Sequence, residues 1–207
     1  MPKGPTKRRP ETQARLQEAA RQVFAEVGFH GATISDISER AGYTNGAFYS
    51  NYANKDELFL ALVDANAERV REQLQQRIET LNASDLTLDR IAELFAMVQP
   101  EDQQWFLIST EFTLHAIRHP DVARRFAEHK ANLRAELVTV METAFARTGR
   151  AASVDLGDLV RLLIAIREGS LRQSFVEPDE LPPGHLERAF WPLLFNAVTT
   201  PVEGAQA

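Results

Sequence analysis

The 207-residue sequence predicts an all-α fold, in which a small N-terminal domain of three helices precedes a larger helical domain. Apolar residues recur at helical spacing in nine segments, and glycine, proline or a capping residue bounds each segment. No run of four or more residues alternates with β-branched enrichment, so no strand is expected. The breaks between segments favour one domain over residues 1–55 and another over residues 56–207.

The first two helices have clear ends. The first is expected over about residues 11–27, with one apolar face and Gly28 at its end. Thr33 and Asp36 have the form of a capping box and mark the start of the second helix. Gly42, a residue that adopts left-handed backbone angles easily, ends that helix.

The third helix, expected over about residues 45–52, is capped by Thr44 and has two unlike sides. At about 100° per residue, the apolar side carries Ala47, Phe48 and Tyr52. The other side carries Asn45, Gly46, Tyr49 and Ser50. A short helix, a glycine turn and a second helix with small and hydrogen-bonding outer residues are typical of a helix-turn-helix that reads DNA.

The remaining helices follow from caps and prolines. Asn54 caps the fourth helix, Pro100 ends the fifth, and Pro120 stands in the first turn of the seventh. Six helices are expected, over about residues 55–81, 88–98, 101–118, 120–148, 156–175 and 184–198.

The N-terminal quarter of the chain resembles the TetR family of one-component transcriptional regulators. The residues that carry the resemblance are Ala41-Gly42, Thr44-Asn45, Gly46, Phe48, Tyr49, Tyr52, Lys55 and Leu58. The preceding helix and the Gly31-Ala32-Thr33 lead-in also match, and one departure is Tyr52, where phenylalanine is commoner. The resemblance implies a homodimeric repressor that a small, largely apolar effector releases from a near-palindromic operator in double-stranded DNA.

The candidate DNA-binding residues lie in and beside the helix-turn-helix. They are Thr33, Thr44, Asn45, Gly46, Tyr49, Ser50, Asn51 and Lys55. The Tyr49 hydroxyl suits phosphate contact, although an aromatic there can also simply cover the helix pair. Lys55 opens the fourth helix, where an ammonium is unfavourable for the helix dipole but well placed for a phosphate; the alternative is an ordinary solvated lysine.

Charge is distributed unevenly along the chain. Residues 1–55 hold eight basic and five acidic residues, whereas residues 56–207 hold fifteen basic and twenty-four acidic residues. The net charge of the whole chain is −6. A locally positive face is sufficient for phosphate contact. The basic arm formed by Lys3, Lys7, Arg8 and Arg9 is either a solvated tail or a further DNA contact.

The resemblance places a ligand pocket among the fourth to eighth helices. The residues predicted to line it are Phe95, Met97, Trp105, Phe112 and His115, an apolar set with few polar groups, as small-molecule sites usually have. A plain helical core is the alternative explanation for each of them. No cofactor and no metal are expected.

In this family the last two helices pair with those of a second subunit in a four-helix bundle. Phe190, Trp191, Leu194 and Phe195 fit that use. Such a dimer spaces its recognition helices by one turn of DNA, about 34 Å.

Other functions have weaker support. Glu111, His115 and His119 share one helical face and suggest a metal-responsive regulator or an enzyme, but no nucleophile motif accompanies them. A ligand-independent architectural DNA-binding protein also remains open. Because no nucleophile motif is present, an enzyme is not expected. The absence of cysteine, of a long apolar run and of a signal-peptide core predicts a soluble cytoplasmic protein.

Overall fold

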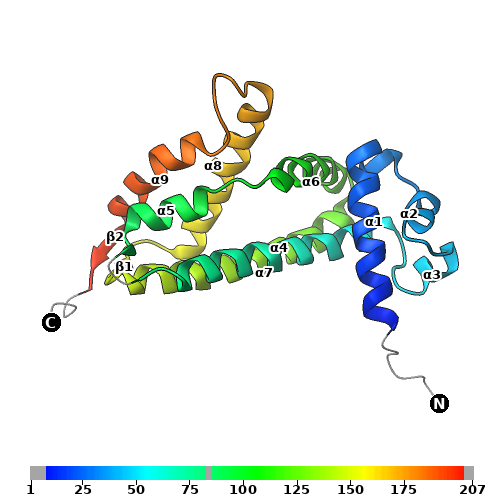
Figure 1. The fold of residues 1–207 in the computed structure, drawn as a ribbon, viewed down its shortest axis with the longest axis horizontal. Coiled ribbons are helices and arrows are strands. Elements are labelled where there is room, and N and C mark those ends of the chain that lie inside the picture. Colours follow the sequence, from blue (N-terminus) through cyan, green and yellow to red (C-terminus); the bar gives the residue numbers. More distant parts are fainter. Residues whose placement is uncertain (1–7, 83–84, 203–207) are drawn as a thin grey trace, which may run out of the picture. The chain divides into compact units, whose positions relative to one another are not determined.

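A computed structural model describes residues 8–82 and 85–202, and within these residues it confirms the all-α fold (Figure 1). The described helices are α1 (Arg8–Gly31), α2 (Ile34–Arg40), α3 (Asn45–Tyr49), α4 (Lys55–Glu79), α5 (Leu88–Ala96), α6 (Pro100–Arg118), α7 (Pro120–Arg147), α8 (Leu156–Val176) and α9 (His185–Val198). Most of the predicted ends agree with these bounds to within a few residues. None of the described helices is long and apolar enough to cross a membrane.

The chain folds into two compact units. One comprises Met1–Asn66 and Gln104–Lys130, and the other comprises Ala67–Gln103 and Ala131–Ala207. Most of α6 and the first turns of α7 therefore pack with the N-terminal helices. The predicted division into residues 1–55 and 56–207 stays a prediction about function, because the two compact units have different boundaries.

The first unit has an aromatic centre. Phe29, Phe59 and Phe112 are buried, with Phe59 stacked on Phe112 at 3.9 Å between ring centroids. Phe29 meets Phe112 edge to face at 5.0 Å. Such ring contacts stabilise the fold beyond the contribution of buried apolar area. This aromatic centre therefore holds α6 and the start of α4 against α1.

The second unit buries a separate core. In Figure 1, α5 and α9 lie side by side, and their buried faces include Ile91 and Phe195. Phe195 also meets Phe145 of α7 at 5.4 Å between ring centroids. The C-terminal helix is thus part of the core of this unit.

The expectation that no strand would form was wrong. Strands β1 (Arg150–Ala152) and β2 (Thr199–Pro201) pair antiparallel. Each is too short to show alternation, and almost fifty residues separate them, so no hairpin signal marks the pair.

Candidate DNA-binding site

The start of α2 is held by the predicted capping box. The Thr33 hydroxyl accepts the N–H of Asp36 at 3.1 Å, and the Asp36 carboxylate accepts the N–H of Thr33 at 3.0 Å. The Thr33 hydroxyl also donates to that carboxylate at 2.7 Å, and these bonds lower the pKa of Asp36. Gly42 has a φ of 74°, which confirms the left-handed turn predicted between α2 and α3.

Helix α3 is anchored on one side only. The Thr44 hydroxyl caps it by accepting the N–H of Ala47 at 3.3 Å. Phe48 is completely buried, whereas the Tyr49 side chain is 59% exposed. The two rings meet edge to face at 5.6 Å between centroids. The core therefore holds α3 through Phe48 and leaves Tyr49 directed to solvent.

The polar residues of α3 have different roles in the fold. Asn45 is exposed and its amide donates to the hydroxyl of Ser35 in α2 at 3.2 Å. Ser50 donates to the carbonyl of Gly46 at 2.8 Å, and the Asn51 amide donates to the carbonyl of Ala47, also at 2.8 Å. Thus Asn45 and Gly46 face solvent at the start of α3, while the Ser50 and Asn51 side chains turn back onto the helix.

Ser35 is a functional candidate that the sequence predictions missed. It is exposed at the start of α2 and bonded to Asn45. In a helix-turn-helix the two short helices pack against each other at an angle, so a polar residue of α2 on the side that meets α3 was a candidate that the sequence could have supplied.

The Lys55 side chain crosses to the end of α1. Its ammonium donates to the carbonyls of Phe29 at 2.6 Å and Ala32 at 2.8 Å, and it lies 4.6 Å from the centroid of the Phe29 ring. Burial lowers the pKa of Lys55, while Asp56 acts in the opposite direction. Lys55 is therefore not the ordinary solvated lysine of the alternative reading, and it closes the last turn of α1 whether or not it also contacts phosphate.

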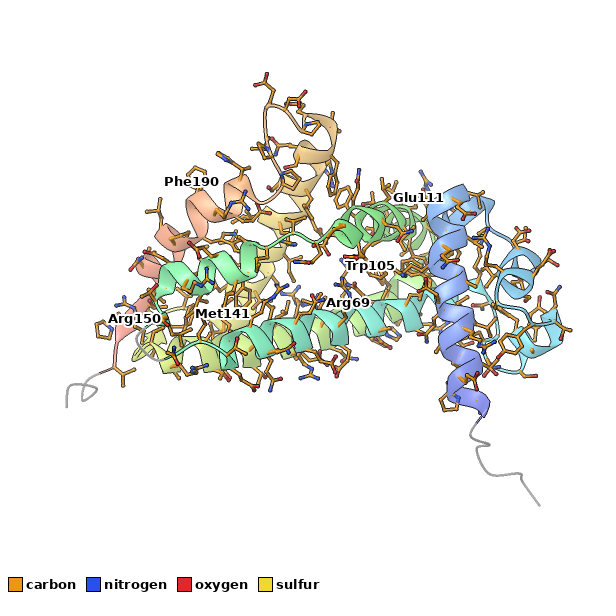
Figure 2. All side chains as sticks on the ribbon, in the orientation of Figure 1. Arg69, Trp105, Glu111, Met141, Arg150 and Phe190 are labelled. Atoms are coloured by element: carbon orange, nitrogen blue, oxygen red, sulfur yellow. The ribbon has the colours of Figure 1, made fainter. Side chains whose placement is uncertain are left out.

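Glu111 of α6 holds the same corner from the other side (Figure 2). Its carboxylate accepts the N–H of Phe29 at 2.6 Å. Gly28 has φ 75° and ψ 167° where α1 kinks, and a Cβ there would lie 2.7 Å from a Glu111 oxygen. The kink thus depends on glycine for both backbone angle and space.

The predicted ligand-lining residues divide between the two units. Trp105, Phe112 and His115 belong to the first, where Phe112 is fully buried in the aromatic centre. Phe95 and Met97 belong to the second, at the end of α5, where Met97 is 46% exposed. For Phe112 the structure supports the alternative of a plain core residue.

The face of α6 proposed for metal binding has other partners. The Glu111 carboxylate accepts the N–H of Phe29, and the Nδ1 of His119 lies 2.7 Å from the carbonyl of His115. The Nε2 of His115 lies 3.2 Å from the Asp56 carboxylate. Within the described ranges, no three side chains of the usual metal-binding types are grouped to hold an ion. The metal-responsive alternative stays a prediction.

Two of the residues expected in a dimer bundle belong instead to the core of the second unit. Trp191 is 2% exposed and Phe195 is fully buried, whereas Phe190 is 56% exposed and Leu193 is 65% exposed. Figure 2 shows Phe190 on the outer side of α9. Leu194 is half-buried. Trp191 and Phe195 therefore lie on the buried face of α9, and Phe190 and Leu193 lie on its exposed face.

Of the predicted basic arm, Lys3 and Lys7 lie outside the described residues, whereas Arg8 and Arg9 belong to the first turn of α1 and not to an arm ahead of it.

Both regions match known families. The model of bacterial regulatory proteins of the tetR family matches residues 16–62, and that of the C-terminal part of BetI-type transcriptional repressors matches residues 87–190. The transcriptional repressor AcnR of Corynebacterium diphtheriae is 30% identical over 115 residues, which are 56% of this chain and 55% of AcnR. The chain thus spans just over half the length of that relative.

Solved structures agree over nearly the whole chain. GusR of Salmonella enterica has a TM-score of 0.69 and 26% identity, covering 90% of this chain and 96% of GusR. FadR of Bacillus subtilis has a TM-score of 0.62 at 15% identity, covering 89% and 98%, which shows the fold alone. These families contain transcriptional regulators and not enzymes. The chain belongs to the TetR family of bacterial regulatory proteins.

Proposed function

We propose that the protein is a homodimeric repressor that binds a near-palindromic operator with α3 in the major groove. The observation that carries this proposal is the division of α3: Phe48 is buried while Asn45, Gly46 and Tyr49 are exposed on the same short helix. Because Phe48 is packed into the core, α3 is fixed in place and its exposed side has a defined orientation. A recognition helix needs such an orientation to read base edges.

Contacts of two kinds are proposed. Asn45 and Gly46 stand at the start of α3, where recognition helices meet base edges. Thr44 and Tyr49 supply hydroxyls suited to phosphate, and we add Ser35 to this group. Thr33 is proposed as a weaker phosphate contact, because its hydroxyl already donates to Asp36. Lys55 is proposed to assist through the helix end that it stabilises. Ser50 and Asn51 are proposed to contribute less, because each side chain already donates to a backbone carbonyl of α3.

The dimer is proposed to form through α8 and α9. Leu162, Phe190 and Leu193 are 47%, 56% and 65% exposed on these helices. We propose that they join in one apolar patch, as is typical of protein interfaces. Leu193→Glu should yield monomers in sedimentation velocity. Ile117→Glu is the matched control, since Ile117 is 71% exposed on α6. A Leu193→Glu protein with the mass of a dimer would place the interface elsewhere.

The effector is proposed to be a small, largely apolar molecule. Support comes from the partly buried Phe95 and the 46%-exposed Met97 and from the FadR structure of the same fold, which was solved in complex with stearoyl-CoA. A ligand that prefers the state incompetent for DNA binding lowers operator affinity by that preference.

The complete proposal is tested by electrophoretic mobility shifts with an operator that is first selected from random DNA fragments by binding to the protein. We expect one dimer per operator, and release by at least one member of a series of apolar carboxylic acids and acyl thioesters. Release by divalent metal ions alone would favour the metal-responsive alternative. Operator binding that no compound alters would favour the architectural one.

A further inference from the structure

The two-stranded sheet of the second unit has an alternating pattern of hydrogen bonds. The N–H of Val202 donates to the carbonyl of Gly149 at 2.9 Å, and the N–H of Ser153 donates to the carbonyl of Val198 at 2.8 Å. In an antiparallel pair, bonded positions recur at every second residue. Ala151, midway between Gly149 and Ser153, therefore directs its backbone groups toward β2.

Arg150 and Ala152 consequently direct their N–H and C=O groups away from β2. Among the residues that the structure describes, none forms a hydrogen bond with these backbone groups. Ala151, between them, is exposed. Strand β1 thus presents a short row of unpaired donors and acceptors, which is a template for another strand.

The outer edge of β2 is blocked. Pro201 has no N–H to donate. The carbonyl of Thr199 accepts the guanidinium of Arg150 at 2.7 Å, and the Thr199 hydroxyl accepts a second bond from it at 2.8 Å. Figure 2 shows Arg150 at the end of the second unit where the two short strands lie. Since proline and occupied carbonyls prevent strand addition at β2, the sheet can grow only at β1.

Space for an added strand exists beside β1. An open groove with a volume of about 700 Å³ is lined by all three β1 residues. Its other walls include Val138 and Phe145 of α7 and Leu156 of α8. The lining also includes Glu142 and Asp155. Backbone groups along one wall and mixed apolar and acidic residues along the others suit an extended segment.

We infer that β1 pairs antiparallel with β1 of a second copy of this chain, about a two-fold axis at Ala151. Arg150 then faces Ala152 of the second copy, and each such pair exchanges both of its hydrogen bonds. The unpaired groups of β1 are complementary to themselves under this rotation, which is the condition for an isologous contact. Two copies form one four-stranded sheet with Pro201 at both outer edges.

The pairing deepens the dimer of the proposed function and rests on it. Strand β1 precedes α8, whose N-cap is Asp155, and β2 directly follows α9 at Val198. The sheet therefore lies at one end of the two helices proposed to form the bundle, and we place its pairing in the same dimer.

Single-cysteine cross-linking tests the pairing, because the chain has no cysteine of its own. In Ala151→Cys the two thiols face each other at a non-hydrogen-bonded position, where Cα atoms lie about 4.5 Å apart, within the range of a disulfide. Thr200→Cys is the matched control, since Thr200 is the exposed β2 partner of Ala151. Three strand spacings would separate its two copies by about 14 Å.

We expect mild oxidation of folded full-length protein to convert most of Ala151→Cys to a covalent dimer, at a rate at least tenfold above that of Thr200→Cys. Equal rates for the two variants, or a dimer by sedimentation that Ala151→Cys does not trap, would overturn the strand pairing and leave the helical dimer standing. A wild-type protein that sediments as a monomer would overturn the proposed dimer itself.

Discussion

The Glu111 carboxylate accepts the backbone N–H of Phe29 at 2.6 Å, and Lys55 takes the carbonyl of that same residue, also at 2.6 Å. One residue at the end of α1 is therefore held by α6 through its donor and by α4 through its acceptor. A buried peptide group left unpaired is costly, so movement of α6 or α4 within this unit must disturb the corner that precedes α2.

Gly28→Ala should destabilise the protein by about 1–3 kcal/mol, because its backbone angles are strained for alanine and the new Cβ meets Glu111 at 2.7 Å. Gly42→Ala is the control. Its φ of 74° is almost the same, but nothing lies within 4 Å of the added Cβ. Urea unfolding should rank Gly28→Ala clearly below Gly42→Ala. Equal losses would mean that Glu111 moves aside freely.

Lys55→Ala should lower the free energy of unfolding by about 1.5–3 kcal/mol, since two carbonyls lose a charged donor. If Lys55 also touches phosphate, the salt dependence of DNA binding should flatten by about one unit of slope. Unfolding and DNA titrations over a range of salt separate these roles. Weaker DNA binding at unchanged stability would contradict the structural role.

His115 should make stability depend on pH. Burial lowers the pKa of its imidazole, with His119 and His30 acting in the same direction and Asp56 opposing them. The unfolded chain then binds more protons than the folded one below about pH 6.5, so stability should fall as the pH drops through that region. Wild-type protein should lose more stability than His115→Gln between about pH 7.5 and about pH 5.5. Equal losses in urea unfolding would argue against this assignment.

Tyr49→Phe should weaken operator binding several-fold, corresponding to one lost hydrogen bond of about 1 kcal/mol, and should leave stability unchanged because the ring is exposed. Tyr52→Phe is the opposite case. The Tyr52 hydroxyl accepts the Gln17 amide at 3.0 Å and the ring is buried, so stability should fall slightly while DNA affinity stays the same. Anisotropy titrations that show equal affinity for wild-type protein and Tyr49→Phe would remove Tyr49 from the phosphate contacts.

Local signals predicted the helix-turn-helix well. The Thr33–Asp36 capping box and the Gly42 turn depend on residues three or fewer positions apart, so the sequence alone specifies them. The burial of Phe48 and the exposure of Tyr49 follow from helical spacing in the same way.

Long-range partners could not be predicted in this way. Lys55 reaches Phe29 across 26 positions, and Glu111 reaches it across 82. Periodicity shows that α9 is apolar but not which of its faces the same chain covers, so Trp191 was assigned to the wrong surface. The β1–β2 pair was missed for the same reason, since its residues meet only after the second unit has folded.

Selection of bound DNA from random fragments, with purified wild-type protein and Asn45→Ala at one salt concentration, tests operator recognition most directly. We expect wild-type protein to enrich a near-palindrome with half-sites about one DNA turn apart, and Asn45→Ala to shift the preferred bases within each half-site. Folded, dimeric protein that enriches no sequence would contradict the proposal that α3 reads an operator.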